Sequence, residues 1–203
     1  MPEHSGLTDP NLHEPKGIST ASVGDLYRAD GAGSGSWVRP YNMGWEDYNH
    51  GGGSQSLTSG VWVDLQNDGA GAFTNLSYKI PGAGNIWDTS THQFNWAAAG
   101  LQLGDTVDIR FDVVPNINTS NDLIALRLDM AHGTGSEYPL EIFRRAIKNS
   151  GSSQIVVFYS VYMGDTNTLN NPAKVAMFAD SASDSVQVNG WYVRQIRREA
   201  VWA

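Results

Sequence analysis

The chain has 203 residues, of which 40% are hydrophobic and 17% charged, so it can bury the core of one main domain. Its formal net charge of -8 argues against a nucleic-acid partner, because binding to a phosphate backbone needs clustered cations. The absence of cysteine excludes disulfides and thiolate chemistry, and no apolar run in the sequence is long enough to span a membrane.

The first part of the sequence, residues 1–40, has few candidate core residues among many Gly, Ser, Asp and Pro residues. We expect these residues to form an extended N-terminal attachment arm. The glycine-rich segment Asp30–Ser36 predicts a flexible joint, because glycine and small polar residues cannot fix the backbone by burial. The arm also lacks the basic-then-apolar order of a signal peptide, which favours a soluble product of the cytoplasm.

Residues 41–203 differ in character, because aromatic residues become dense and apolar residues alternate with polar ones, the pattern of strands with one buried face. In Val107–Val113, four apolar residues alternate with three charged ones, and Ile124–Met130 shows a similar pattern. Turn residues separate further short segments of this kind, and no long segment has helical spacing. About eight to ten strands must stack as two sheets or close a barrel, since each strand otherwise leaves an apolar face in water. We therefore predict an all-β fold, in which an antiparallel β-sandwich of jelly-roll type covers residues 41–203 and follows the arm.

One predicted strand, Gln154–Tyr162, is apolar on both of its faces. Such a strand is either central in the core or has its second face covered by another subunit, although loops of the same chain could also cover it. This segment gives the strongest indication of self-association in the sequence. The candidate residues of a homotrimer interface are Val156, Phe158, Tyr159 and Tyr162.

The sequence lacks motifs for catalysis and for cofactor binding. Its five histidines have no spacing typical of a metal pair, and no Gly-x-Ser-x-Gly elbow marks a serine hydrolase. The segment Asp64–Asn75 begins like a calcium loop but ends in asparagine where a bidentate glutamate is needed, so a hairpin turn is the better interpretation. The sequence has enough carboxylates to form a glycosidase pair, but most of them are better explained as residues of solvated faces or turns. We therefore predict a protein that is not an enzyme and has no catalytic residues, no metal and no other cofactor.

Three ring-bearing residues stand close together in residues 41–53, a glycine-rich segment predicted to be a loop: Trp45, Tyr48 and His50. Exposed aromatic rings bind sugars by stacking, and a β-sandwich is a common support for them. These residues are therefore candidates for contacts with a host surface glycan. Two other interpretations remain open, in which the rings anchor the linker onto the sandwich or fill a subunit interface. The remaining tryptophans of the body are expected in the core or an interface: Trp62, Trp87, Trp96 and Trp191.

The arm contains the consecutive residues His13, Glu14, Pro15, Lys16 and Gly17. Together with the Ser- and Gly-rich stretch that ends at Trp37, they resemble the leader of small tailed-phage virion proteins. These are head decoration, head fibre and tail fibre proteins in which a His-x-Pro-Lys-Gly arm and a Gly/Ser joint precede a β-rich domain. The resemblance in sequence covers residues 1–40. The rest of the chain resembles these proteins only in its expected architecture, a trimeric jelly-roll domain.

The resemblance implies a protein that fastens to a capsid or tail lattice through its arm while the sandwich faces outward. Its partners would be the major capsid protein or another lattice protein of the virion, and its location the virion, assembled in the host cytoplasm. Pro15 and Gly17 suit such an arm because they fix an extended backbone and allow close approach. Lys16 and His13 can pair with carboxylates of the lattice, and a homotrimer that presents three arms gains avidity.

Two functions remain open. The first is a non-enzymatic structural protein that decorates or cements a phage capsid. The alternative is a receptor-binding or carbohydrate-binding protein at the tip of a tail or head fibre, where the loop aromatics meet host glycan. The body has no repeat, long coiled coil or fibre shaft, which favours a compact decoration protein.

Overall fold

The computed structural model describes residues 21, 26–29, 35–38, 42–80 and 82–197. The chain divides into two compact units, Met1–Asn42 and Met43–Ala203. The attachment motif expected at residues 13–17 lies outside the described residues. Within the described part, no helix has the length and apolar character needed to cross a lipid bilayer.

The described part of the first unit is a two-stranded antiparallel hairpin of β1 (Leu26–Ala29) and β2 (Gly35–Val38). Tyr27 and Trp37 are register partners, and their rings meet edge to face with centroids 5.4 Å apart. Gly35 therefore belongs to a paired strand, as does the serine after it, and the flexible joint predicted over residues 30–36 is wrong for these two residues. The cross-strand ring pair stabilises the hairpin, a contact that the glycine-rich composition hides.

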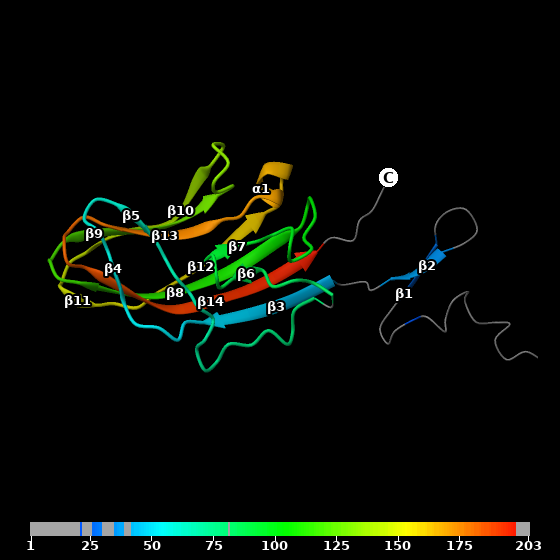
Figure 1. The fold of residues 1–203 in the computed structure, drawn as a ribbon, viewed down its shortest axis with the longest axis horizontal. Helices are drawn as coiled ribbons and strands as arrows, with labels where there is room; N and C mark the ends of the chain where they lie inside the picture. The colour runs from blue at the N-terminus through cyan, green and yellow to red at the C-terminus, as the bar shows by residue number, and fades with distance from the viewer. Residues whose placement is uncertain (1–20, 22–25, 30–34, 39–41, 81, 198–203) are drawn as a thin grey trace, which may run out of the picture. The chain divides into compact units, whose positions relative to one another are not determined.

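The second unit contains the following elements in chain order: β3 (Asn42–Asn49), β4 (Gln55–Ser56), β5 (Trp62–Asp64), β6 (Trp87–Asp88), β7 (Gln93–Phe94), β8 (Thr106–Ile117), β9 (Asp122–Met130), β10 (Tyr138–Ile147), β11 (Gly151–Ser152), β12 (Ile155–Tyr162), α1 (Thr166–Asn170), β13 (Lys174–Ala179) and β14 (Ser185–Arg197). Figure 1 shows that the long strands lie in two stacked layers. One layer, which we name the β8 sheet, has the strand order β12-β8-β14-β3, and β11 and β4 pair with its ends. The other, the β9 sheet, has the order β10-β9-β13-β5.

The order of these strands is that of a jelly roll. Numbered along the chain from β3 to β14 with the short β4, β6, β7 and β11 left out, the β8 sheet contains the first, eighth, third and sixth strands. The β9 sheet contains the second, seventh, fourth and fifth. Neighbouring strands run antiparallel in the pairs β12–β8 and β8–β14 of the first sheet and β10–β9, β9–β13 and β13–β5 of the second. Two four-stranded antiparallel sheets in this Greek-key order confirm the fold predicted from period-two alternation.

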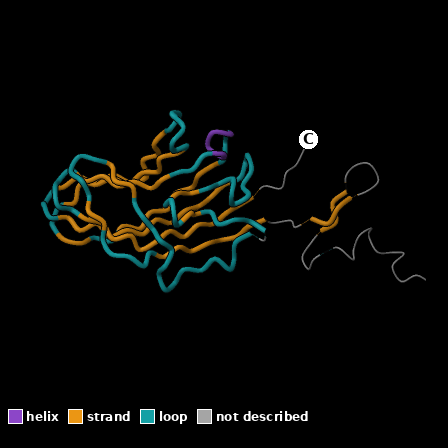
Figure 2. The backbone as a smooth tube through the Cα atoms, viewed as in Figure 1, coloured by secondary structure: helices purple, strands orange, loops and turns teal. Residues whose placement is uncertain are grey.

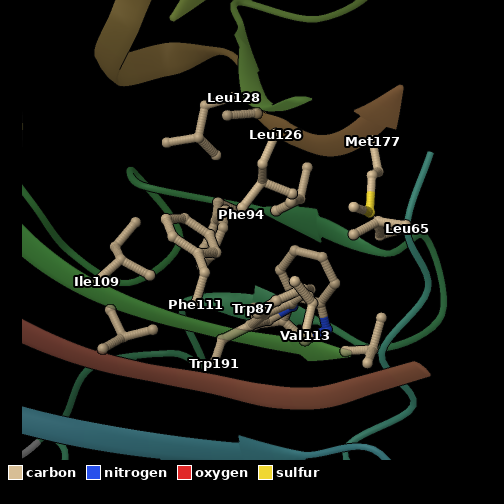
Figure 3. Close-up of a cluster of buried hydrophobic side chains, with 14 of the residues drawn as sticks. Leu65, Trp87, Phe94, Ile109, Phe111, Val113, Leu126, Leu128, Met177 and Trp191 are labelled. Carbon is tan, nitrogen blue, oxygen red and sulfur yellow. The ribbon is translucent and has the colours of Figure 1, made fainter. Parts of the chain in front are cut away.

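The core lies between the two sheets and follows the alternation in the sequence. In β8 the apolar residues from Val107 to Val113 point inward and are fully buried, while the charged residues between them face outward. Figure 3 shows Leu126, Leu128 and Met177 of the β9 sheet facing the inward residues of the β8 sheet. This apolar layer supplies the main stabilisation of the sandwich.

The segment between β5 and β8 is mostly loop (teal in Figure 2), yet it supplies three large rings to the core. Trp87 and Phe94 pair across the short β6–β7 ladder, and Phe94 stacks on Trp96 with centroids 5.1 Å apart. Trp87 also meets Trp191 of β14 edge to face at 5.9 Å. The expected core position is confirmed for Trp87, Trp96 and Trp191, because all three are buried. Trp62 instead lies half-buried in β5, at the edge of the β9 sheet.

Candidate functional site

The outer face of the β8 sheet carries a row of large side chains that crosses all four of its strands. Phe158 of β12 is the register partner of Arg110 of β8, and Arg110 is the register partner of Tyr192 of β14. Trp45 of β3 contacts Tyr192 on its other side, and Tyr78 from the loop after β5 stacks on Trp45. We name these five residues the cross-sheet row. They meet because outward-facing positions on neighbouring strands lie side by side.

Most rings of the row are stacked against one another. The Arg110 guanidinium lies 5.6 Å from the ring centroid of Tyr192, a distance at which the cation attracts the ring face. Trp45 lies 5.7 Å from Tyr192 at an interplanar angle of 33°, and 4.7 Å from Tyr78 at 21°. Trp45 is therefore in contact with a ring on each side, and its faces are not an open platform for a sugar. Phe158 differs, because 71% of it is exposed and no described aromatic ring stacks on it.

A hollow of about 400 Å³ lies on the row. Phe158, Arg110 and Tyr192 line it together with the polar group Asp108, Ser160 and Arg194. The carboxylate of Asp108 accepts hydrogen bonds from Ser160 Oγ at 2.6 Å and Arg194 Nε at 3.1 Å. Burial opposes ionisation of this carboxyl, but the bonds from Ser160 and Arg194 outweigh it and lower the pKa of Asp108. The hollow thus combines one free ring with a fixed anion and two cations.

Asp112, two residues after Arg110 in β8, belongs to a second group of hydrogen-bonded polar side chains. Asp112 accepts hydrogen bonds from Asn189 Nδ2 at 2.8 Å and from Gln154 Nε2 at 3.0 Å. Burial raises the pKa of Asp47, and the charge of Arg110 partly offsets this effect. Among the described residues, Nε of Arg110 has no hydrogen-bond partner. Arg110 therefore keeps a donor that its neighbours do not use.

The structure separates the three ring-bearing residues predicted as one glycan or interface group. Trp45 belongs to the cross-sheet row, but Tyr48 is fully buried and its hydroxyl donates to Glu46, so Tyr48 as an exposed contact is wrong. The physical reason is that residues 42–49 form strand β3 and not a loop, so that alternate side chains face the core. His50 Nδ1 lies 3.0 Å from Asp68 Oδ1, which also accepts from the backbone N–H of Gly51. His50 therefore fixes the ends of two loops.

Glu46 explains why this strand was hidden from sequence reasoning. It is a fully buried carboxyl that faces inward from β3 and accepts hydrogen bonds from Gln195 Nε2 at 2.6 Å and Ile86 N at 3.2 Å. Burial raises its pKa, and the bonds to Tyr48 and to its other partners partly offset the rise. A charged residue at an inward position breaks the apolar-polar alternation by which a strand is recognised.

The structure places the predicted interface residues of β12 on two different faces. Val156, Phe158 and Tyr162 point outward and are 46%, 71% and 59% exposed. Tyr159 faces the other way, is the register partner of the buried Ile109 and packs against the core, so its expected place in an outward interface is wrong. The strand is at the edge of its sheet, and among the described strands it pairs with β8 alone. Sequence reasoning missed Arg110, Tyr192 and Tyr78, although the alternation in β8 and β14 places the first two outward.

The segment that begins like a calcium loop does not gather its oxygen atoms at one point. Asp64 lies at the end of β5, where its carboxylate pairs with Lys174 Nζ at 2.6 Å. Asp68 accepts from the N–H groups of Gly51 and Ala70. Hydrogen bonds to these N–H groups lower the pKa of Asp68. Within the described residues, no group of three His, Asp or Glu side chains could hold a metal ion.

Comparison with known proteins finds no matching family profile and no matching curated protein. Among solved structures, the chain is similar to a capsid structure from the T13 particle of IBDV, with 7% identity, a TM-score of 0.43 and coverage of 86% of this chain and 36% of that one. It is also similar to the PRD1 vertex protein P5, with 15% identity, a TM-score of 0.35 and coverage of 76% and 95%.

A third similar structure is the CBM22-1–GH10 part of the xylanase Xyn10B from Clostridium thermocellum, solved with xylohexaose. Here the identity is 18%, the TM-score is 0.34, and the match covers 51% of this chain and 19% of that one. The chain thus spans only about a fifth of the xylanase chain and about a third of the IBDV chain. What the structure itself defines is a jelly-roll protein with an exposed, partly aromatic sheet face.

Proposed function

We propose that this protein is a non-enzymatic structural protein of a phage particle, which decorates or cements the capsid surface as a homotrimer. The observation that carries the proposal is the outward row of Val156, Phe158 and Tyr162 on the edge strand β12. Large apolar side chains that stay in water on an edge strand are typical of an interaction surface. The resemblance of the arm to the leaders of phage virion proteins supports a location on a phage particle.

Self-association through β12 is favourable for two physical reasons. Burying a side chain of the size of Phe158 contributes roughly 2 kcal/mol, and each of three copies would bury one. An edge strand also presents unpaired backbone groups to a partner. The charged group of Asp108 and Arg194 lies beside Phe158 and would form the polar rim of such an interface.

Attachment to the particle is assigned to the arm. The cations of Lys16 and His13 would pair with carboxylates of a lattice protein, while Pro15 and Gly17 shape the backbone. Each arm binds weakly alone because its ordering costs entropy. Three arms on one trimer bind together with a much higher apparent affinity.

The oligomeric state tests the proposal. We expect light scattering of the full chain at micromolar concentration to give the mass of a trimer, and the variant Phe158→Ser to give a monomer with an unchanged circular dichroism spectrum. The matched control is Phe73→Ser, since Phe73 is 81% exposed but lies in the loop after β5. This control should remain trimeric. A monomeric wild type would refute the homotrimer.

A second candidate function is binding of a host receptor glycan by a fibre tip, and the hollow beside Phe158 favours it. A sugar could place its C–H face on the free ring of Phe158 and its hydroxyls on Asp108 and Arg194. The trimer interface and the glycan would cover the same ring, so the two functions exclude each other on this face. Glycan-array binding by wild type that Phe158→Ser abolishes, together with a monomeric wild type, would favour the second function.

A further inference from the structure

The β8–β9 turn and the β13–β14 turn lie at the same end of the sandwich (left in Figure 1), and a buried aspartate stands at the end of each turn. Asp122 begins β9 directly after the β8–β9 turn, and Asp184 ends the turn that joins β13 to β14. Their exposed fractions are 3% and 1%. Carboxyl groups are seldom buried to this extent without partners, so both side chains need hydrogen-bond donors or the loss of their charge.

Each aspartate accepts a hydrogen bond from the turn that carries the other. Asp122 Oδ1 accepts from the backbone N–H of Ser181 at 3.2 Å, and Asp184 Oδ1 accepts from the N–H of Asn118 at 2.8 Å. The backbone carbonyl of Asp184 also accepts from the N–H of Leu57, next to β4, at 2.8 Å. The two carboxyls therefore tie together the two turns that close this end of the sandwich.

The second oxygen of each carboxyl is left over. Oδ2 of Asp122 and Oδ2 of Asp184 are buried, and among the described residues neither has a conventional hydrogen-bond partner. The cross-links between the two turns bring the carboxyls close enough for Asp122 to raise the pKa of Asp184. A buried oxygen without a donor is costly, and two neighbouring buried anions repel, but a single proton shared by the two carboxyls reduces both costs.

The described surroundings offer no positive charge that could replace this proton. Ile147 of β10 lies opposite Asp122 in the register, and the nearby cations Arg145 and Lys148 are exposed. Asp180, at the start of the β13–β14 turn, is exposed and adds a further negative charge. No described cation forms an ion pair with Asp122 or Asp184.

We propose that Asp122 and Asp184 share one proton, and that this proton holds the two turns together, so that the end of the sandwich opens more readily when it is lost. Burial, followed by the hydrogen bond and the negative charge of Asp122, raises the pKa of Asp184 from 3.8 to about 6. Because the folded pKa lies above the unfolded value, the stabilisation is complete below pH 3.8 and is lost as the pH rises through about 6. This difference corresponds to an increase on the order of 100-fold in the unfolding equilibrium constant.

The test compares chemical unfolding of the full-length wild type and Asp122→Asn between pH 4 and pH 8. The wild type should lose stability across this range relative to the variant, because an asparagine amide donates to Asp184 at any pH. The difference between the two proteins is the readout, since the buried Glu46 gives both of them a dependence of the same sign. Asp184→Asn provides a second variant with the same expected loss of pH dependence.

The matched control is Asp180→Asn, an exposed carboxylate of the same turn, which should keep the pH dependence of the wild type. Equal slopes for wild type and both pair variants would overturn the shared proton. So would a rise in melting temperature when calcium chloride is added to the wild type at pH 7.5 but not to Asp122→Asn, because the pair would then hold a cation.

Discussion

The outer faces of the two sheets use the same residue types in different ways. On the β9 sheet, the guanidinium of Arg127 lies 4.2 Å from the ring centroid of Trp62, and its Nη2 donates to Asp129 at 2.9 Å. On the β8 sheet, the guanidinium of Arg110 lies on Tyr192, but the described residues offer its Nε no partner. The guanidinium of Arg127 is therefore paired with both a ring and a carboxylate, whereas Arg110 lies on a ring and stands beside the exposed ring of Phe158.

The difference arises from the neighbours of each arginine. Arg127 is the register partner of Ala176, whose small side chain leaves room for the guanidinium to reach across β13 to Trp62. Across this small residue, Arg127 meets both a ring and a carboxylate. Arg110 on the β8 face has no such small register partner, because Phe158 and Tyr192 stand on either side of it.

The largest expected effect tests what holds β3, and with it Trp45, in the β8 sheet. A Cβ added at Gly190, at the bulge in β14, would lie 2.4 Å from the carbonyl oxygen of Tyr48 in β3. We expect Gly190→Ala to cost about 3 kcal/mol of unfolding free energy by overpacking. Gly53→Ala is the control, because nothing lies within 4 Å of a Cβ there, and it should be close to neutral. Chemical denaturation measures both, and equal losses would contradict the reasoning.

The next effect compares the two arginines directly. Arg127→Ala removes a close cation–ring contact and a hydrogen-bonded ion pair, and should lower the unfolding free energy by about 1–2 kcal/mol. Arg110→Ala removes a more distant ring contact and a positive charge near Asp47, but no ion pair found among the described residues, so its loss should stay below about 1 kcal/mol. Urea unfolding of the two variants gives the comparison. A greater loss of unfolding free energy for Arg110→Ala would mean that Arg110 makes stronger contacts within the protein than Arg127 does.

A third test separates the β8 face from the arm. Lys16→Glu combined with His13→Ala should weaken capture by undecorated particles in a pull-down, because the expected contacts are charge-assisted pairs. The same variant should keep the melting temperature and the trimer mass of the wild type. Full binding by this variant would place the attachment surface on the sandwich instead.

The smallest expected effect is that of chelation. The described residues hold no group of three metal-ligating side chains, so EDTA should leave the melting temperature unchanged. The control is the same protein with added calcium chloride. A melting temperature that falls with EDTA and recovers with calcium would contradict this prediction.

The fold could be predicted from the sequence because the alternation in β8 and β9 is nearly complete. The candidate site was only partly predictable. Phe158 and Trp45 were recognised as apolar or aromatic residues without an obvious place in the core, but Tyr48 was misplaced because Glu46 hides the alternation of β3. Tyr159 was misplaced because a strand with apolar residues on both faces does not reveal which residues face inward. Only the register with β8 decides the face.

The pairing of β3 with β14 has a consequence for folding during synthesis. β3 begins at residue 42 and β14 ends at residue 197, and these two strands are neighbours in the β8 sheet. The sheet cannot be completed until the last strand has left the ribosome. The contacts that close the sandwich therefore join the two ends of the body, which predicts slow folding after synthesis and exposure of unpaired strands until then.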